Sequence, residues 1–143
     1  MSGNLEERRR TENDAVKFYM TKGIISIDSR ARATEAAQTM YDYRPGSVLI
    51  EKNGEYIGIL TEGDISKRVI AELKKPIEVQ VETIMSQPII TIESNKLMEA
   101  AFLTMEKNGI RHIAVTEDDA IIGMLSIRDF SSYYVRKFSN RKK

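Results

Sequence analysis

The sequence contains no cysteine, no tryptophan and a single histidine, His112. Without cysteine there are no disulfides, thiolate metal sites or cysteine nucleophiles, and one histidine excludes a multi-histidine metal site within the chain. No apolar run approaches the roughly 18 residues that span a bilayer, and the charged N-terminus lacks the apolar core of a signal peptide. These absences predict a soluble cytoplasmic protein that neither enters a membrane nor requires a metal or cofactor.

The composition is that of an ordinary globular chain. Its 143 residues, 41% hydrophobic and 30% charged, suffice for one domain or for two half-size lobes packed together. A net charge of +1 creates no global field that would favour nucleic acid or a membrane surface. No paired general base and nucleophile is present, so the sequence does not predict an enzyme.

The chain repeats itself at an offset of 65 residues. When residues 16–66 are placed on residues 81–131 without a gap, 14 of the 51 pairs are identical, whereas chance would give about three. Most identities fall at apolar or special positions, so the repeat is one of structure. The expected divisions are a charged N-terminal segment at 1–15, repeats at 16–75 and 76–135, and a basic tail at 136–143.

Each repeat reads as strand, helix, strand, strand, helix, which predicts an α+β fold. Hydrophobic spacing, helix propensity and turn residues place these elements. The ranges expected in the first repeat are a strand at 24–27, a helix at 32–43, a hairpin at 47–60 and a helix at 65–75. Those in the second are a strand at 89–92, a helix at 95–108, a hairpin at 112–125 and a helix at 130–138. Turns are predicted at Asn53-Gly54 and Asp118-Asp119, and a linker at 76–80.

One short pattern closes both hairpins. It reads "GILTEGDI" at 58–65 and "GMLSIRDF" at 123–130, and we call these stretches the Asp64 frame and the Asp129 frame. A hydroxyl followed three residues later by an acid is typical of a capping box at a helix start. Free N–H groups at a helix start also attract phosphate, so ligand binding stays open beside capping. Capping does not explain the glycine, which would let a flat base or a phosphate approach the backbone.

The doublet resembles the tandem cystathionine-β-synthase-type (CBS) domain, or Bateman module. The residues that carry the resemblance are "GIISI…EAAQTM…VLIEKNGEYIGILTEGDI" and "PIITI…EAAFLTM…HIAVTEDDAIIGMLSIRDF". It implies two β-α-β-β-α repeats packed about a pseudo-twofold axis, with clefts for AMP, ADP or ATP. In that family the acid of the frame binds ribose, its hydroxyl binds phosphate, and the early strand holds the base. The residues so assigned are Thr61, Asp64, Ile24 and Ile25 in one copy, and Ser126, Asp129, Ile89 and Ile90 in the other.

The two copies differ in charge around the frame. The second copy has Arg111 and His112 at the start of its middle strand, where many family sites place a basic residue to meet phosphate. It also has Arg128 two residues after the hydroxyl. The first copy has Gly46, Ser47 and Glu62-Gly63 at the matching places. We therefore expect the Asp129 frame to bind a nucleotide more tightly. His112 as a packed histidine at a sheet edge, and Arg128 as a solvated helix-start residue, are the structural alternatives.

The leading prediction is a non-catalytic sensor that binds an adenine nucleotide and acts on an unknown effector protein. A purely structural dimerisation module, S-adenosylmethionine or NAD binding, and nucleic-acid binding through the basic tail stay as alternatives. The family often dimerises through its helices, so a homodimer is expected. The faces expected to meet are Ile65, Val69 and Leu73 in the first repeat and Phe130, Tyr134 and Phe138 in the second.

Overall fold

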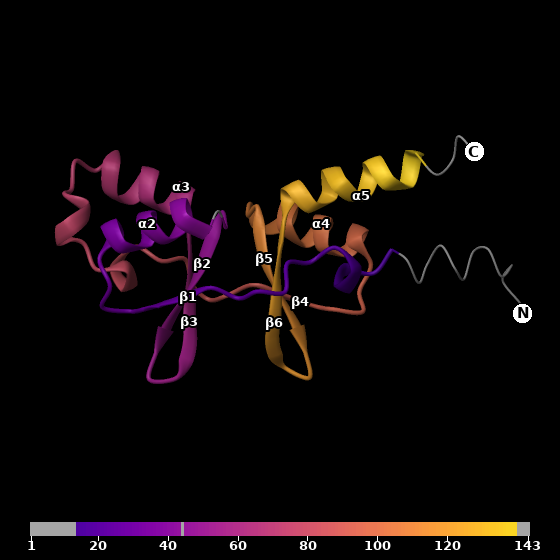
Figure 1. Cartoon of the computed structure of the whole chain (residues 1–143), viewed down its shortest axis with the longest axis horizontal. Helices are drawn as coiled ribbons and strands as arrows, with labels where there is room; N and C mark the ends of the chain where they lie inside the picture. Colours follow the sequence, from indigo (N-terminus) through magenta and orange to yellow (C-terminus); the bar gives the residue numbers. More distant parts are fainter. Residues whose placement is uncertain (1–13, 44, 140–143) are drawn as a thin grey trace, which may run out of the picture. The chain divides into compact units, whose positions relative to one another are not determined.

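A computed structural model describes residues 14–43 and 45–139 (Figure 1). Most of the expected N-terminal segment, residues 1–13, and the end of the basic tail, residues 140–143, lie outside the described residues. The chain is α+β, as predicted, with helices joined to two three-stranded sheets. Among the described residues, no helix is long and apolar enough to cross a membrane.

The chain forms two compact units whose boundaries differ from those of the sequence repeats. The first unit is Gly23–Ile90, and the second combines the described residues up to Lys22 with those from Thr91 onward. Residues 76–90 therefore stay with the first repeat, although the sequence division assigns them to the second. The segment expected as a linker begins this stretch, and Val79 within it is buried.

The two units share one pattern of pairing. Each sheet has a short first strand parallel to a central strand, which pairs in turn with an antiparallel third strand. The strands of the first unit are β1 (Ser26–Asp28), β2 (Ser47–Lys52) and β3 (Glu55–Thr61). Those of the second are β4 (Thr91–Glu93), β5 (His112–Glu117) and β6 (Ala120–Ser126).

A further strand-like contact in each unit comes from a segment distant in sequence. Ser86 bridges Ile59 in the first unit, and Thr21 bridges Met124 in the second. These four residues form two pairs related by the 65-residue offset. The 14–22 segment is also tied to the residues that lead into the helix Met98–Asn108, since the Val16 N–H donates to the Lys96 carbonyl at 2.8 Å. Each unit is thus completed by residues that precede the other unit's first strand.

The helices follow the predicted order, although several begin up to three residues from their expected starts and one continues in a different helix type. They are α2 (Ala33–Tyr43), α3 (Glu62–Ile65), α4 (Met98–Asn108) and α5 (Ile127–Ser139), with short 3-10 turns at Val16–Phe18, Pro76–Glu78 and Val81–Thr83. The helix expected at 65–75 starts earlier, at Glu62, and its continuation Ser66–Ile70 is a π-helix. The helix does not reach residue 75, because Leu73 adopts a left-handed conformation with φ of 58°.

The hairpin turns are confirmed. Asn53 and Gly54 have φ of 52° and 80°, and Asp118 and Asp119 have 50° and 64°. Two consecutive positive φ angles match the right-handed twist of the strands that they join. Asp118 and Asp119 are therefore the turn residues of the second hairpin.

The cores use part of the surface that we expected for self-association. Val69 and Phe130 are buried inside their own units, at 0% and 4% exposure, and Ile65 packs against the first unit's core. The assignment of Val69 and Phe130 to a dimer face was therefore wrong. Leu73 and Phe138 are exposed.

Candidate ligand-binding site

The Asp64 frame forms a complete capping box. The Asp64 N–H donates to Thr61 Oγ1 at 3.1 Å, and the Thr61 N–H donates to Asp64 Oδ2 at 2.9 Å. These two bonds satisfy backbone donors that a helix start leaves without partners. The capping interpretation is confirmed for this frame.

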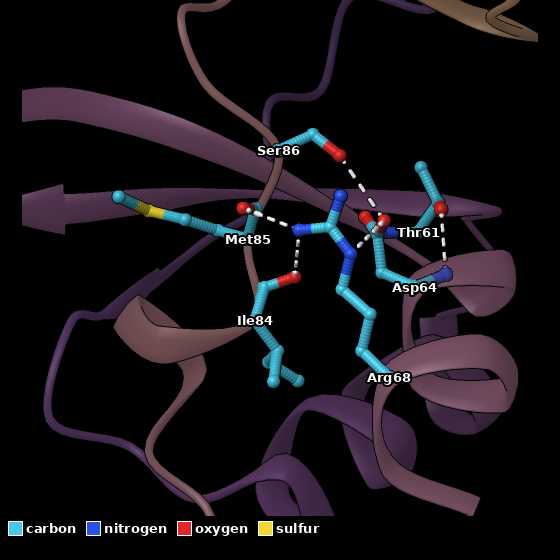
Figure 2. A network of polar contacts seen from close by, with 6 residues as sticks. All are labelled: Thr61, Asp64, Arg68, Ile84, Met85 and Ser86. Carbon is cyan, nitrogen blue, oxygen red and sulfur yellow. Dashed lines mark hydrogen bonds and ion pairs between the residues drawn. The ribbon is translucent and has the colours of Figure 1, made fainter. Parts of the chain in front are cut away.

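The other carboxylate oxygen of Asp64 is also engaged. Ser86 Oγ donates to Asp64 Oδ1 at 3.1 Å, and the Arg68 guanidinium Nε lies 3.9 Å from the same oxygen (Figure 2). One terminal nitrogen of Arg68 donates to the carbonyls of Ile84 and Met85, at 3.1 and 3.0 Å. Asp64 is 9% exposed, so its carboxylate is nearly buried within a network of its own unit.

The Asp129 frame is arranged differently. Asp129 Oδ2 accepts from the Ser126 N–H at 2.7 Å, and the Ser126 hydroxyl lies 3.3 Å from the same oxygen. Within the described residues, both hydrogen bonds of Asp129 therefore end on Oδ2, and Oδ1 accepts none. Asp129 is only half-buried, which leaves one carboxylate oxygen able to accept from a ligand.

The glycine of the frame is explained by the chain itself. A Cβ at Gly58 would lie 2.4 Å from Met85 Sδ and 3.0 Å from the Ser86 carbonyl, and a Cβ at Gly123 would lie 2.8 Å from the Thr21 carbonyl. The segments 14–22 and 76–90, which we call the crossing segments, therefore pass so close to Gly123 and Gly58 that a larger residue would not fit. No base or phosphate is needed to explain either glycine.

Two positions distinguish the units around the acid. The residue 65 positions after Arg68 is Tyr133, and Ser86 corresponds to Thr21. Tyr133 is buried, and its ring meets the edge of Tyr19 with centroids 5.1 Å apart. Where the first unit has a guanidinium beside its acid, the second therefore has an aromatic pair.

Tyr133 also belongs to a polar clamp between α5 and the 14–22 segment. Lys137 Nζ donates to Tyr133 Oη at 3.1 Å and pairs with Asp14 at 3.5 Å. Burial raises the pKa of Tyr133, and the hydrogen bond with Tyr133 raises the pKa of Lys137. The clamp helps to hold the segment that supplies Thr21.

The basic residues predicted for the second copy gather near the start of α5. The Arg111 carbonyl accepts from the Ile127 N–H at 2.9 Å, and His112 faces Ser126 in the strand register. Arg111 and Arg128 are exposed, and His112 is half-buried. β5 is the central strand, and His112 is its first residue, beyond the stretch Ala114–Thr116 that pairs with β4; the alternative of a packed histidine at a sheet edge therefore stays open.

At the described positions of the first unit that match Arg111, His112 and Arg128, the residues are Gly46, Ser47 and Gly63, none of which is basic. The Gly46 carbonyl accepts from the Glu62 N–H at 3.3 Å, and Ser47 is buried opposite Thr61. The predicted difference in charge is therefore present in the folded chain.

The early strands hold the remaining predicted residues. Ile24 and Ile25 are half-buried before β1, where the Ile25 carbonyl accepts from the Leu49 N–H at 3.0 Å. Ile89 and Ile90 are half-buried directly before β4, at the end of the first unit. Sequence reasoning missed Ser86, although the hydroxyls aligned at positions 21 and 86 were a usable signal.

Comparison with known proteins identifies the repeats. The CBS domain family model matches residues 15–71 and 81–136. An uncharacterised protein of Methanopyrus kandleri is 34% identical over 110 residues, which are 76% of this chain and 56% of that protein. The chain thus spans little more than half the length of this relative.

Two solved structures have a fold similar to that of this chain. An uncharacterised conserved protein from Pyrococcus horikoshii superposes with a TM-score of 0.79 at 27% identity, covering 86% of this chain and 93% of that one. The CBS domain pair of protein MJ0100, solved with 5′-methylthioadenosine and S-adenosyl-L-methionine, has a TM-score of 0.76 at 26% identity, covering 86% and 97%.

Proposed function

This chain belongs to the CBS-domain family, and from that premise we propose that it is a non-catalytic regulatory module that binds an adenosine-containing ligand at the Asp129 frame. The observation that carries the proposal is that Asp129 is half-buried and that its Oδ1 accepts no hydrogen bond among the described residues. A carboxylate in this state can accept from the vicinal hydroxyls of a ribose. The MJ0100 domain pair, which was solved with two adenosine compounds, supports this ligand class.

The charges near the frame favour a phosphorylated ligand. Arg111 and Arg128 are exposed close to the start of α5, a helix of 13 residues. Guanidinium groups bind phosphate by charge-assisted hydrogen bonds, and a helix start favours negative charge. We therefore propose AMP, ADP or ATP ahead of S-adenosylmethionine, with the Ser126 hydroxyl and His112 near the phosphate.

A thermal-shift panel tests this proposal. It compares AMP, ADP, ATP, S-adenosylmethionine, 5′-methylthioadenosine, NAD, GTP and a short DNA duplex, followed by calorimetry. A ligand that binds the native state stabilises it by about 2.7 kcal/mol at 100 times its Kd, so the adenine nucleotides should raise Tm most. Chromatography of the mixtures should show no product. If no adenosine compound shifts Tm, a structural dimerisation module becomes the better account.

We also propose that the chain forms a homodimer through exposed aromatic side chains of α5. Tyr134 and Phe138 are 42% and 56% exposed, and their rings stack with centroids 6.1 Å apart. Exposed apolar groups gathered on one helix favour association. Light scattering at micromolar concentration should report about twice the chain mass of 16.3 kDa, and Tyr134→Ser should shift the protein toward monomer. A wild-type monomer would contradict the proposal.

A further inference from the structure

We infer that the Asp64 frame is closed by side chains of its own unit, so that the chain binds one adenosine ligand through the Asp129 frame. The inference rests on the proposed function and assigns unequal roles to two frames that share their motif residues. In the first unit, Ser86 and Arg68 contact the Asp64 carboxylate, which is the group that would accept from a ribose.

The first step concerns the acceptor. Both oxygens of Asp64 accept a hydrogen bond inside the unit, Oδ2 from the Thr61 N–H at 2.9 Å and Oδ1 from Ser86 Oγ at 3.1 Å. The carboxylate is nearly buried as well. A ribose hydroxyl that displaces Ser86 would exchange one hydrogen bond for another and would have to open the packing first. Such a ligand gains little from this acid.

The second step concerns the cation. Arg68 lies four residues after Asp64, with its Nε 3.9 Å from Asp64 Oδ1, and a guanidinium at this place could bind the phosphate of a ligand. In the structure, its Nη1 donates to two main-chain carbonyls, those of Ile84 and Met85, while its Nε faces Asp64 (Figure 2). A phosphate that took over this terminal nitrogen would leave the two carbonyls without the donor that they have in the unit.

The third step is the comparison inside the chain. At the positions matched by the 65-residue offset, the second unit has Tyr133 and Thr21 in place of Arg68 and Ser86. Tyr133 turns to Tyr19 and Lys137, and Thr21 is exposed. Within the described residues, Asp129 therefore receives hydrogen bonds from Ser126 alone. The two substitutions, rather than the motif, separate a closed frame from an open one.

Calorimetry with AMP and with 5′-methylthioadenosine tests the closure. We expect one ligand per wild-type chain, a loss of at least tenfold in affinity for Asp129→Asn, and less than a twofold change for Asp64→Asn. The double variant Arg68→Met/Ser86→Ala should bind a second ligand. Lys67→Met is the matched control, because Lys67 is exposed on the same helical stretch and its side chain makes no hydrogen bond or ion pair among the described residues.

Three outcomes would overturn the inference: two ligands on the wild-type chain, equal losses for the two asparagine variants, or a stoichiometry of one for the double variant. A wild-type chain that binds neither probe would instead refute the proposed function.

If the wild-type chain binds neither probe, a measurement without ligand still tests whether Arg68 and Ser86 close the Asp64 frame. If Arg68 and Ser86 act in one network with Asp64, then Arg68→Met and Ser86→Ala should each lower Tm, and their combined shift should fall short of the sum of the single shifts. Lys67→Met should leave Tm unchanged. Strictly additive shifts, or equal shifts for Arg68→Met and Lys67→Met, would show that no such network closes the frame.

Discussion

Replacing the glycine of either frame by alanine tests why both frames contain it. A Cβ at Gly123 would lie 2.8 Å from the Thr21 carbonyl oxygen, a backbone atom held in place by its hydrogen bond from the Met124 N–H at 2.9 Å. The crossing segment must then move away and weaken two backbone hydrogen bonds, each worth about 1 kcal/mol. Overpacking by one methyl group costs about 1–3 kcal/mol, so we expect Gly123→Ala to cost about 2 kcal/mol.

Gly58→Ala should cost somewhat less. The nearest atom to its new Cβ is Met85 Sδ at 2.4 Å, the mobile end of a flexible side chain, although the Ser86 carbonyl follows at 3.0 Å. Met85→Ala removes a core side chain and is destabilising by itself, but it also removes the sulfur that clashes, so the double variant Gly58→Ala/Met85→Ala should lose less stability than the sum of the two single variants. Displacing Ser86 would also loosen its hydrogen bond to Asp64.

The matched control is Gly63→Ala, two residues after Thr61 and in the same frame as Gly58. A Cβ at Gly63 would lie 3.5 Å from Thr61 Oγ1, an ordinary contact. Alanine is favoured over glycine in a helix by about 0.5–1 kcal/mol, so this variant should be neutral or slightly stabilised. Urea unfolding followed by circular dichroism measures all three. If Gly58→Ala and Gly123→Ala unfold at the same urea concentration as Gly63→Ala, close approach of the crossing segments does not explain the glycines.

Two further predictions follow from local geometry. Tyr133→Phe should lower stability by about 1 kcal/mol because Lys137 loses its acceptor, whereas the exposed neighbour Tyr134→Phe should not. The pKa values of Tyr133 and Lys137 are both raised in the folded state. The protonated side chains therefore stabilise the fold below the ordinary tyrosine pKa of 10.0, and this stabilisation is lost as pH rises through the folded-state pKa values. Urea midpoints between about pH 9 and pH 11 should therefore fall less for Tyr133→Phe than for wild type, and an equal fall would refute the assignment. Gly54→Ala, at φ of 80°, should cost about 1 kcal/mol, unlike Gly23→Ala, whose Cβ would meet nothing within 4 Å; equal melting temperatures would exclude strain at the turn.

The sequence was sufficient for whatever depends on near neighbours. Turns such as Asn53-Gly54 follow from the backbone preferences of two residues. The box formed by Thr61 and Asp64 follows from a spacing of three at a helix start. The repeat itself, with its order of strands and helices, is visible because the apolar positions recur at a constant offset.

The contacts that the sequence did not predict join residues far apart in the chain. Each crossing segment packs in the unit that does not directly follow it in the chain. This depends on which strand edge the segment meets, and hydrophobic periodicity carries no information about that choice. The role of Arg68 depends on two carbonyls 16 and 17 residues away. The π-helical continuation after Ile65 also escaped prediction, because its side-chain pattern is compatible with an ordinary helix.

The Asp64 frame and the Asp129 frame meet the same structural requirements, so the motif by itself does not indicate which of them binds a ligand. In both units the glycine admits a crossing segment, and the acid accepts from the N–H of the hydroxyl residue. A chain would keep these residues to hold the hairpin, the helix start and the crossing segment together even without a ligand. What distinguishes the units is the residue four positions after the acid, Arg68 in one and Tyr133 in the other. Whether a frame of this kind can receive a ligand should therefore be judged from that position and from the crossing segment, since the motif alone describes the closed and the open frame equally well.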